Sequence, residues 1–387
     1  MSRSHPSPRT QRGFSLLELM IAVVIGMFSV VVILQVLSGT ATSRRIAVGG
    51  GDAQLNGVAA IRALQLDLEQ AGLGLQSFNI SGCSLAYTAG DGASVTLAAL
   101  APVVINAAQV PAGDTNTDTL IVIAGNSGSP SEGDVLTAAT NTIAYVVTTP
   151  DSFATGNRVV AAPATRGATC ALSLARVTGL SGFTLAITGG VSGLASGSIA
   201  YNLGSTPTIR AYAVRNGDLT VCDYLTYDCG RASYASPVSE AVWVPVAGNI
   251  ASMRAQYARD TSGIAGATST MDGVVDTFDQ LTPGVASDSA TIPVYCKWAR
   301  IVGVQIAVVA RSQQYDQTLA YTGYPTLTTT KTVLQPPTWA GSASAPITLT
   351  GTNWDRYRYT VMQTRIPLRN AIWQGAQPTY QGGSGGC

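Results

Sequence analysis

A single acidic residue, Glu18, lies near the start of a long apolar stretch. Residues 14–37 contain no other charged residue. A carboxylate at the edge of an apolar helix is costly unless it is paired, protonated or held near water. Its natural partner is the new α-amino group that Phe14 would gain if the chain were cut after Gly13. These residues therefore predict a charge pair between a processed N-terminus and Glu18.

The stretch that carries Glu18 is long enough to cross a membrane. As a helix, residues 14–37 would span roughly 36 Å, against a hydrocarbon core of about 30 Å. Ahead of it lie Arg3, Arg9 and Arg12 without an acidic residue, which predicts a cytoplasmic leader. An ordinary signal peptide is disfavoured, because the apolar segment is too long and no small-x-small cleavage site follows it.

The sequence from Gly13 to Glu18, Gly-Phe-Ser-Leu-Leu-Glu, resembles the type IV prepilin signature. This resemblance implies that a membrane aspartyl peptidase cuts between Gly13 and Phe14 and methylates the new N-terminus of Phe14. It also implies a single-pass protein of the inner membrane of a Gram-negative bacterium, with its head in the periplasm and later in an extracellular pilus. The alternative is a generic single-span anchor that happens to carry a glutamate.

Helical spacing continues beyond the apolar stretch. The apolar stripe consists of Ile61, Leu64, Leu68 and Ala71, widened by Leu55, Val58 and Leu66. This predicts one helix from Phe14 to about Ala71, ended by Gly72 and Gly74. Residues 49–51 are three consecutive glycines, each costing about 1 kcal/mol in a helix, and predict a kink or a frayed turn.

From about residue 76 the sequence predicts antiparallel β-structure, because short β-branched runs alternate with Gly, Asn, Asp and Pro clusters. The runs lie at residues 103–105, 119–123, 143–147, 159–160, 183–187, 209–214, 241–245, 251–257, 298–310 and 360–368. A long loop is expected at residues 323–350. The expected fold class is α+β, with a long N-terminal helix on a large antiparallel β-rich head, an arrangement similar to that of type IV pilins. Its expected parts are a cleaved leader (1–13), a transmembrane helix (14–38), its amphipathic continuation (39–75) and the head (76–387).

Charge and histidine content exclude several functions. The chain has 22 basic and 21 acidic residues, and three of the basic ones precede Phe14, which leaves 19 against 21, or −2, after cleavage. No basic field is available for nucleic acid. The only histidine, His5, lies in the leader, so the mature chain has none for a catalytic triad or a zinc site. Carboxylate-only catalysis stays open on this count, but nothing in the sequence points to a cleft, and we predict no enzymatic activity.

All six cysteines lie beyond the apolar stretch, and none forms a CxxC pair. They are Cys83, Cys170, Cys222, Cys229, Cys296 and Cys387. An even number in an exported domain predicts up to three disulfides, with fifteen possible connectivities. The sequence favours Cys222 with Cys229, because the short segment between them can close as a hairpin-like loop. It leaves the other pairings open.

Several later stretches resemble minor pilins of the PilW type. They are residues 53–57 with 64–72, 246–260, 298–312 and 358–370. Gln70 and Leu73 depart from the family pattern, and the Gly82-Cys83 pair stands about ten residues late. The resemblance implies a minor pilin that helps to prime assembly of the pilus and ends at its tip. The partners it implies are other minor pilins, the major pilin, the prepilin peptidase and N-methyltransferase, the inner-membrane assembly platform and a large tip adhesin.

Two other functions fit the same sequence. A J-type pseudopilin of a type II secretion system would share the signal and the architecture. A membrane-anchored adhesin or sugar-binding module would use exposed aromatic residues of the head, although core packing also explains them. These aromatics are Tyr315, Tyr321, Tyr324, Trp339, Trp354 and Tyr357.

Four aspartates are candidate calcium ligands. They are Asp260, Asp272, Asp276 and Asp279. PilW-type sequences often carry an Asp-rich loop here that resembles a calcium-binding run, and calcium takes six to eight oxygen ligands. In this chain residues 261–271 separate the first aspartate from the rest and break the alternation, which favours the alternative of an ordinary Asp/Gly-rich hairpin loop. No other cofactor is expected.

Overall fold

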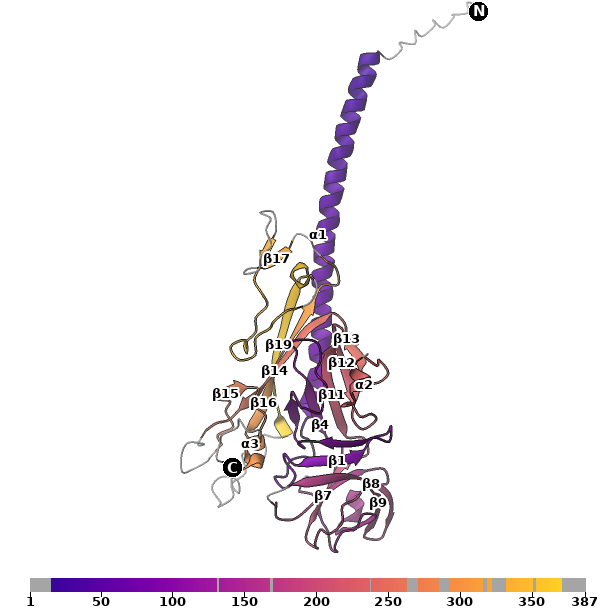
Figure 1. Ribbon diagram of the computed structural model, residues 1–387, viewed down its shortest axis with the longest axis vertical. Helices are drawn as coiled ribbons and strands as arrows, with labels where there is room; N and C mark the ends of the chain where they lie inside the picture. The colour runs from indigo at the N-terminus through magenta and orange to yellow at the C-terminus, as the bar shows by residue number, and fades with distance from the viewer. Residues whose placement is uncertain are drawn as a thin grey trace, which may run out of the picture. The chain divides into compact units, whose positions relative to one another are not determined.

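The fold is α+β, with an N-terminal apolar helix and a large antiparallel β-rich head (Figure 1). This computed structural model describes residues 15–130, 132–167, 170–236, 238–262, 271–284, 292–315, 319–321, 332–350 and 353–370, without the side chains of 41–47, 320–321 and 332–333. The chain divides into two compact units, Met1–Gly51 and Asp52–Cys387.

Helix α1 (Leu16–Gln70) begins in the first unit. Its part Leu16–Thr40 has a mean hydropathy of 2.8, no buried residues, and the length and composition of a membrane span. Polar side chains within it bond to the helix itself: Ser29 Oγ donates to the Ile25 carbonyl at 2.9 Å, and Thr40 Oγ1 to the Leu37 carbonyl at 3.0 Å. A hydroxyl satisfied in this way can enter an apolar medium.

The predicted frayed turn at residues 49–51 is wrong, because all three glycines are α-helical, and the alternative of a kink stays a prediction. Each glycine costs about 1 kcal/mol in a helix, but ending one helix and nucleating another costs more. Helix α1 therefore continues into the second unit and ends at Gln70, just before the predicted stop. Gly72 and Gly74 have φ of +83° and +74°, a conformation that favours glycine.

Only a narrow stripe of α1 is buried in the second unit. Ala53, Ala60, Leu64 and Leu68 are each 0–1% exposed. The predicted widening of this stripe is wrong, since Leu55, Val58 and Leu66 are 71%, 53% and 45% exposed. The rest of the head packs closely against α1 along only one line of small residues, so the side chains beside that line stay exposed. A Cβ on Gly57 would lie 2.9 Å from Met362 Cγ, too close for an unshifted neighbour.

The described residues of the head form four sheets (Figure 1). The largest has the order β2 (Ser94–Leu97), β1 (Ser84–Thr88), β8 (Ala171–Ser181), β7 (Arg158–Ala162), β10 (Ile199–Gly204) and β5 (Asp134–Val135), with β9 (Thr184–Thr188) joining β8 to β6 (Ala144–Val146). Strands β1 and β8 run parallel, starting at the pair Ser84 and Ala171. The other pairs in this sheet are antiparallel.

Two further antiparallel sheets and one small parallel sheet complete the described part of the head. The five-stranded sheet has the order β13 (Val244–Ala247), β12 (Asp218–Asp223), β11 (Thr208–Arg215), β4 (Leu120–Ala124) and β3 (Val103–Ile105). The four-stranded sheet has the order β15 (Thr277–Asp279), β14 (Ile250–Arg259), β16 (Ile301–Arg311) and β19 (Tyr359–Pro367). Strands β17 (Leu319–Tyr321) and β18 (Thr332–Leu334) form the parallel pair. The short helices are η1 (Pro150–Ser152), α2 (Ala232–Ala235), α3 (Val294–Ala299) and η2 (Trp354–Arg356).

Strand β7 separates two hydrophobic cores. Val160 and Ala162 belong to the main core, which also contains Leu64 and Leu68 of α1. Val159 and Ala161, which point to the other face, belong to a second core with residues of β8 and β9. Because both faces of β7 are covered, its sequence is apolar at consecutive positions rather than at alternate ones.

Two expectations for the C-terminal part of the head are wrong. Residues 298–300, expected to begin a strand, close the short helix α3, and the strand starts at Ile301. The expected loop 323–350 contains strand β18, although residues 323–331 lie outside the described residues. Strands β1, β2, β5, β8, β10 and β12 lie at places where we predicted none.

Candidate functional site

Glu18 lies in the first turn of α1, which begins at Leu16. The Leu19 N–H donates to the Ser15 carbonyl at 3.1 Å, so the helical hydrogen bonding has already started around Glu18. The Glu18 side chain is exposed. No cation pairs with it among the described residues. A carboxylate in the first turn of a helix is stabilised by the macrodipole, which favours negative charge at that end.

Gly13 and Phe14, the predicted cleavage position, lie outside the described residues. Residues 14 and 18 stand four positions apart, which is about one helical turn, so an α-amino group at residue 14 would lie about one turn from the Glu18 carboxylate. Such an arrangement can pair a carboxylate with an amine of the same chain, or present it to the amine of a neighbouring copy. Both uses remain predictions.

The second unit holds the end of α1 through one carboxylate, Asp67. Tyr212 of β11 donates its hydroxyl to Asp67 Oδ2 at 2.6 Å. Arg210, two residues earlier on the same strand, donates to both Asp67 oxygens at 3.0 and 3.1 Å. Burial, and then the charge of Asp67, raise the pKa of Tyr212, so this phenol stays protonated and remains a donor. Asp67 therefore fixes the rotation of α1 against β11.

A second contact closes the C-terminal end of α1. Asn370 donates its side-chain N–H groups to the carbonyls of Gln70 and Ala71, at 3.2 and 3.1 Å. The Gly72 N–H donates to the Ile123 carbonyl of β4 at 2.9 Å. The last carbonyls of a helix lack partners within it, and these two contacts join the helix end to the rest of the head. Sequence reasoning missed both roles; Asp67 and Asn370 are noticeable only as parts of the stretches that resemble PilW-type pilins.

Two disulfides between described cysteines stabilise the head. Cys222 and Cys229 are bonded across a separation of 7 residues, and Cys83 and Cys170 across a separation of 87. Cys83 and Cys170 directly precede β1 and β8, so their bond fixes the start of the parallel pairing of these strands. Cys296 is also disulfide-bonded, and Cys387 lies outside the described residues.

Protein donors engage the four candidate calcium ligands. The fully buried Asp260 accepts the N–H groups of Ser262 and Gly273, at 3.0 and 2.8 Å. Its Oδ1 also lies 3.8 Å from Arg300 Nη1. Asp276 accepts the Thr261 N–H at 2.7 Å, and this bond lowers the pKa of Asp276.

The remaining two candidate ligands, Asp279 and Asp272, bond to other protein groups. Asp279 forms an ion pair with Arg259 at 2.8 Å, and Asp272 accepts the Val274 N–H at 2.9 Å. Within the described residues no three acidic, Cys or His side chains converge as a metal site would require. The prediction of a calcium site therefore gains no geometric support here, and residues 263–270 are outside the described part of the chain.

The expected aromatic face is divided between core and surface. Trp339 is 6% exposed and donates its Nε1–H to the Ala345 carbonyl at 2.6 Å. Tyr315, which is 42% exposed, packs edge-on against Tyr357 with their ring centroids 6.1 Å apart. Tyr324 and the side chain of Tyr321 lie outside the described part. The described aromatics thus serve largely in packing.

Comparison with known families identifies two segments of the chain. Residues 8–34 match the prokaryotic N-terminal methylation motif, and residues 214–370 match the type IV pilus-assembly protein W (PilW) family. No curated protein and no solved structure matches the chain. The first match contains Gly13, Phe14 and Glu18, and the second contains β12 to β19 and Asn370. Residues 214–370 thus form a PilW-type domain, residues 8–34 carry a prepilin-type methylation motif, and the chain is a pilin-type protein related to type IV pili.

Proposed function

We propose that the mature chain is a minor pilin that takes part in priming type IV pilus assembly and ends at the pilus tip. The observation that carries the proposal is the presence, in one chain, of a methylation motif on an apolar helix and of a PilW domain. In this proposal the head lies in the periplasm before assembly. The other minor pilins, the major pilin and the inner-membrane assembly platform are its partners.

The first unit supports an assembly role because its apolar surface requires cover. Between Leu16 and Leu37, 17 large apolar side chains are exposed. At about 1.5 kcal/mol each, their transfer from lipid to water would cost on the order of 25 kcal/mol. When the helix leaves the membrane, this surface has to pack against other apolar helices. A pilus made of such helices supplies that environment.

Glu18 then has a defined part in assembly. In an apolar bundle its carboxylate needs a positive partner, and the methylated amine of Phe14, on the same or a neighbouring subunit, supplies one. Removing one member of a buried ion pair is strongly destabilising, because the other charge is left uncompensated. Pairing between subunits would set their axial register in the filament.

The substitution Glu18→Ala tests this proposal in a piliated strain. We expect the peptidase to cut the variant normally, so that it runs as the mature band on a gel, while it is absent from sheared pili. Glu69→Ala, which removes an exposed acid from the same helix, should enter pili like the wild type. Gly13→Val should accumulate as the uncut precursor in the membrane. Incorporation of Glu18→Ala at the wild-type level would contradict the role of this residue.

Location and priming need separate measurements. Antibodies against the head should label one end of each filament, and the full-length protein in detergent should co-purify with the other minor pilins. Deletion of the chain should reduce the number of pili rather than their length, because priming sets how many filaments start. Label along the whole filament would refute the tip location. Loss of type II secretion with normal pili would instead identify a pseudopilin.

A further inference from the structure

An open groove lies on the largest sheet, outside both segments that match known families. It is lined by residues of β1, β2, β7, β8 and β9 and of the turns beside them, all between Ala86 and Gly189. The matched segments are residues 8–34 and 214–370. The groove has a volume of about 560 Å³, within the range of small-ligand sites. The general features of the family therefore do not account for this groove.

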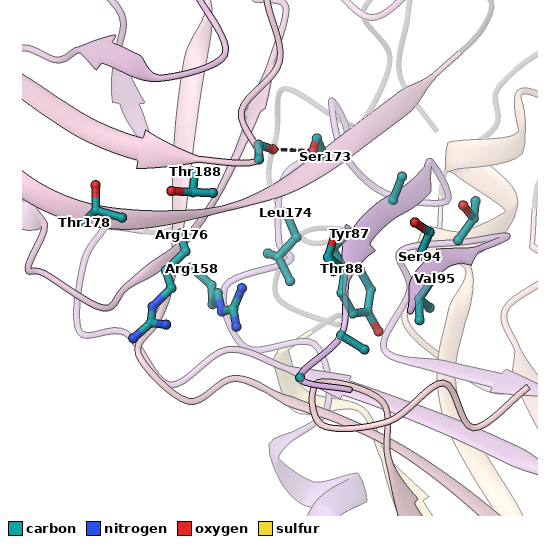
Figure 2. Close-up of a pocket in the computed structure, with 15 residues that line it drawn as sticks. Tyr87, Thr88, Ser94, Val95, Arg158, Ser173, Leu174, Arg176, Thr178 and Thr188 are labelled. Atoms are coloured by element: carbon teal, nitrogen blue, oxygen red, sulfur yellow. Dashed lines mark hydrogen bonds between the residues drawn. The ribbon is translucent and has the colours of Figure 1, made fainter. Parts of the chain in front are cut away.

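Two arginines dominate the charge of the groove. Arg158 of β7 and Arg176 of β8 are directly opposite each other in the antiparallel register. Figure 2 shows their side chains extending from the same side of the sheet, next to Leu174. Both line the groove. Like charges in directly opposed positions destabilise a sheet, so this pair is unfavourable for folding alone.

Nothing in the described part of the head neutralises this pair. The residues that line the groove include no aspartate or glutamate. Three arginines elsewhere in the head contrast with them, because Arg210, Arg254 and Arg259 each lie within 3.0 Å of a carboxylate oxygen. Burial, and then the neighbouring charge of Arg176, lower the pKa of the Arg158 guanidinium. An anion bound between the two guanidinium groups would offset the repulsion between them and would raise the pKa of Arg158 again.

The other walls of the groove fit the rest of a sugar. Hydroxyl groups line it on several strands, from Thr88, Ser94, Thr96, Thr178 and Thr188. Leu174, Val95 and Tyr87 line it as well, but they are only 2%, 4% and 7% exposed, and the Tyr87 hydroxyl donates inward to the Tyr224 carbonyl at 3.1 Å. The Thr188 hydroxyl is directly opposite Arg176 in the register and shares its face of the sheet, and a hydroxyl that both donates and accepts matches the hydroxyl groups of a sugar.

The groove is also held in shape before any ligand arrives. The disulfide Cys83–Cys170 joins the chain just ahead of β1 and β8, which form two of its walls. Ser173 donates its hydroxyl to the Gly189 carbonyl, a bond drawn in Figure 2, and so ties β8 to the turn after β9. A site on paired strands with such cross-links loses little conformational entropy on binding.

We propose that this groove binds an acidic saccharide, with Arg158 and Arg176 holding its carboxylate and the Thr188 hydroxyl contacting the sugar. A planar carboxylate accepts parallel N–H donors from a guanidinium, which gives the pair both strength and direction. A sulfate or phosphate ester on a sugar offers the same chemistry to the arginines. The site goes beyond the proposed role in pilus assembly and does not depend on it.

Calorimetric titration of the full-length chain tests the proposal. The protein is kept in a nonionic detergent without a sugar headgroup, since a maltoside would compete. The probes are a tetramer of galacturonic acid, its neutral galactose counterpart, a sulfated galactose tetramer, inorganic sulfate and a short polyglutamate peptide. We expect the galacturonate tetramer to bind at least about tenfold more tightly than the neutral tetramer, and less tightly as salt is added. The sulfated tetramer shows whether a carboxylate or an ester is the better anion.

Variants connect the binding to the arginines. Arg158→Gln and Arg176→Gln should each lower the affinity for galacturonate about tenfold or more, whereas Arg62→Gln, which removes an exposed arginine from α1, should leave it unchanged. Arg176 is exposed and opposed by a like charge, so Arg176→Gln should melt no lower than the wild type, which separates lost binding from lost folding. All three variants should assemble pili normally, so failure here is distinct from failure of the assembly role.

The proposal would be overturned by no saturable binding of either acidic tetramer, equal binding of the acidic and neutral tetramers, unchanged affinity in both groove variants, or a preference for polyglutamate over the sugars. The last result would assign the groove to an acidic protein segment. Sulfate binding as tight as that of the tetramers would show that the sugar ring contributes nothing, and would also refute the saccharide assignment.

Discussion

Asp67→Ala is the most informative single change in the head, because one carboxylate joins α1 to β11. Asp67 has a side-chain exposure of 13% and accepts the Tyr212 hydroxyl at 2.6 Å. A hydrogen bond to a charged group contributes about 1.5–3 kcal/mol. Arg210 lies within 3.0 Å of the same carboxylate, but it is 46% exposed, so solvent screening reduces its contribution to about 0–1 kcal/mol. We therefore expect Asp67→Ala to lower the free energy of unfolding by about 2–3 kcal/mol.

Urea unfolding of the full-length chain in detergent, followed by tryptophan fluorescence, measures this change. Trp243 and Trp298 are 0% and 3% exposed, so their emission reports the core of the head. A double-mutant cycle then separates the two partners of Asp67. Tyr212→Phe should show the larger coupling to Asp67, and Arg210→Gln a coupling below about 1 kcal/mol.

Glu69→Ala, two positions along the same helix, is the matched control. Glu69 is exposed, and its one described contact is with Gln65, so its loss should change stability by less than about 0.5 kcal/mol. The reasoning fails if Asp67→Ala is no more harmful than Glu69→Ala. It also fails if the coupling to Arg210 exceeds the coupling to Tyr212.

Three further predictions concern the helix end, alkaline pH and calcium. Asn370→Ala should cost about 1–2 kcal/mol in the same urea assay, because the last carbonyls of α1 lose their donor, whereas the exposed neighbour Arg369→Ala should cost almost nothing. Burial raises the pKa of Tyr257 to about 12, against about 10 in an unfolded chain, so its stabilisation is complete below pH 10 and is lost as the pH rises toward 12. Unfolding midpoints between pH 9 and 12 should therefore fall less steeply in Tyr257→Phe than in the wild type, and equal slopes would contradict this assignment. Calorimetric titration with calcium should give no saturable heat, since protein donors already engage Asp260 and Asp276; binding at one site per chain would show the opposite.

The membrane helix and the strongest strands could be predicted from the sequence, because local signals decide them. Residues 14–37 have one charge, and the run at Val103–Ile105 is wholly β-branched, so hydropathy and strand propensity agree with the structure there. Strand β8 was missed because its sequence, Ala-Leu-Ser-Leu-Ala-Arg, has few β-branched residues. Its conformation depends on pairing with β1, β7 and β9, whose positions are not visible locally.

The remaining differences have a common origin in long-range packing. Leu55 and Val58 have the right spacing for a buried stripe, but the head approaches along Ala53, Gly57 and Ala60 instead. The opposed arginines of the groove lie 18 positions apart, and no periodicity connects them. Only the register of β7 against β8 brings them together. Of the predicted assembly site, the structure places Glu18 in the first turn of α1, while Gly13 and Phe14 lie outside its described residues.

The bond between Asn370 and Gln70 joins residues 300 positions apart, which has a consequence for biosynthesis. At about 5–20 residues per second, a ribosome needs on the order of 15–60 s to make the intervening chain. Until then β19 is absent, and β16, whose residues from Ile301 to Ala310 are all buried in the finished sheet, lacks its neighbour on one side. An open apolar strand edge is a template for aggregation. The nascent chain therefore exposes this edge of β16 until its last strand has been made.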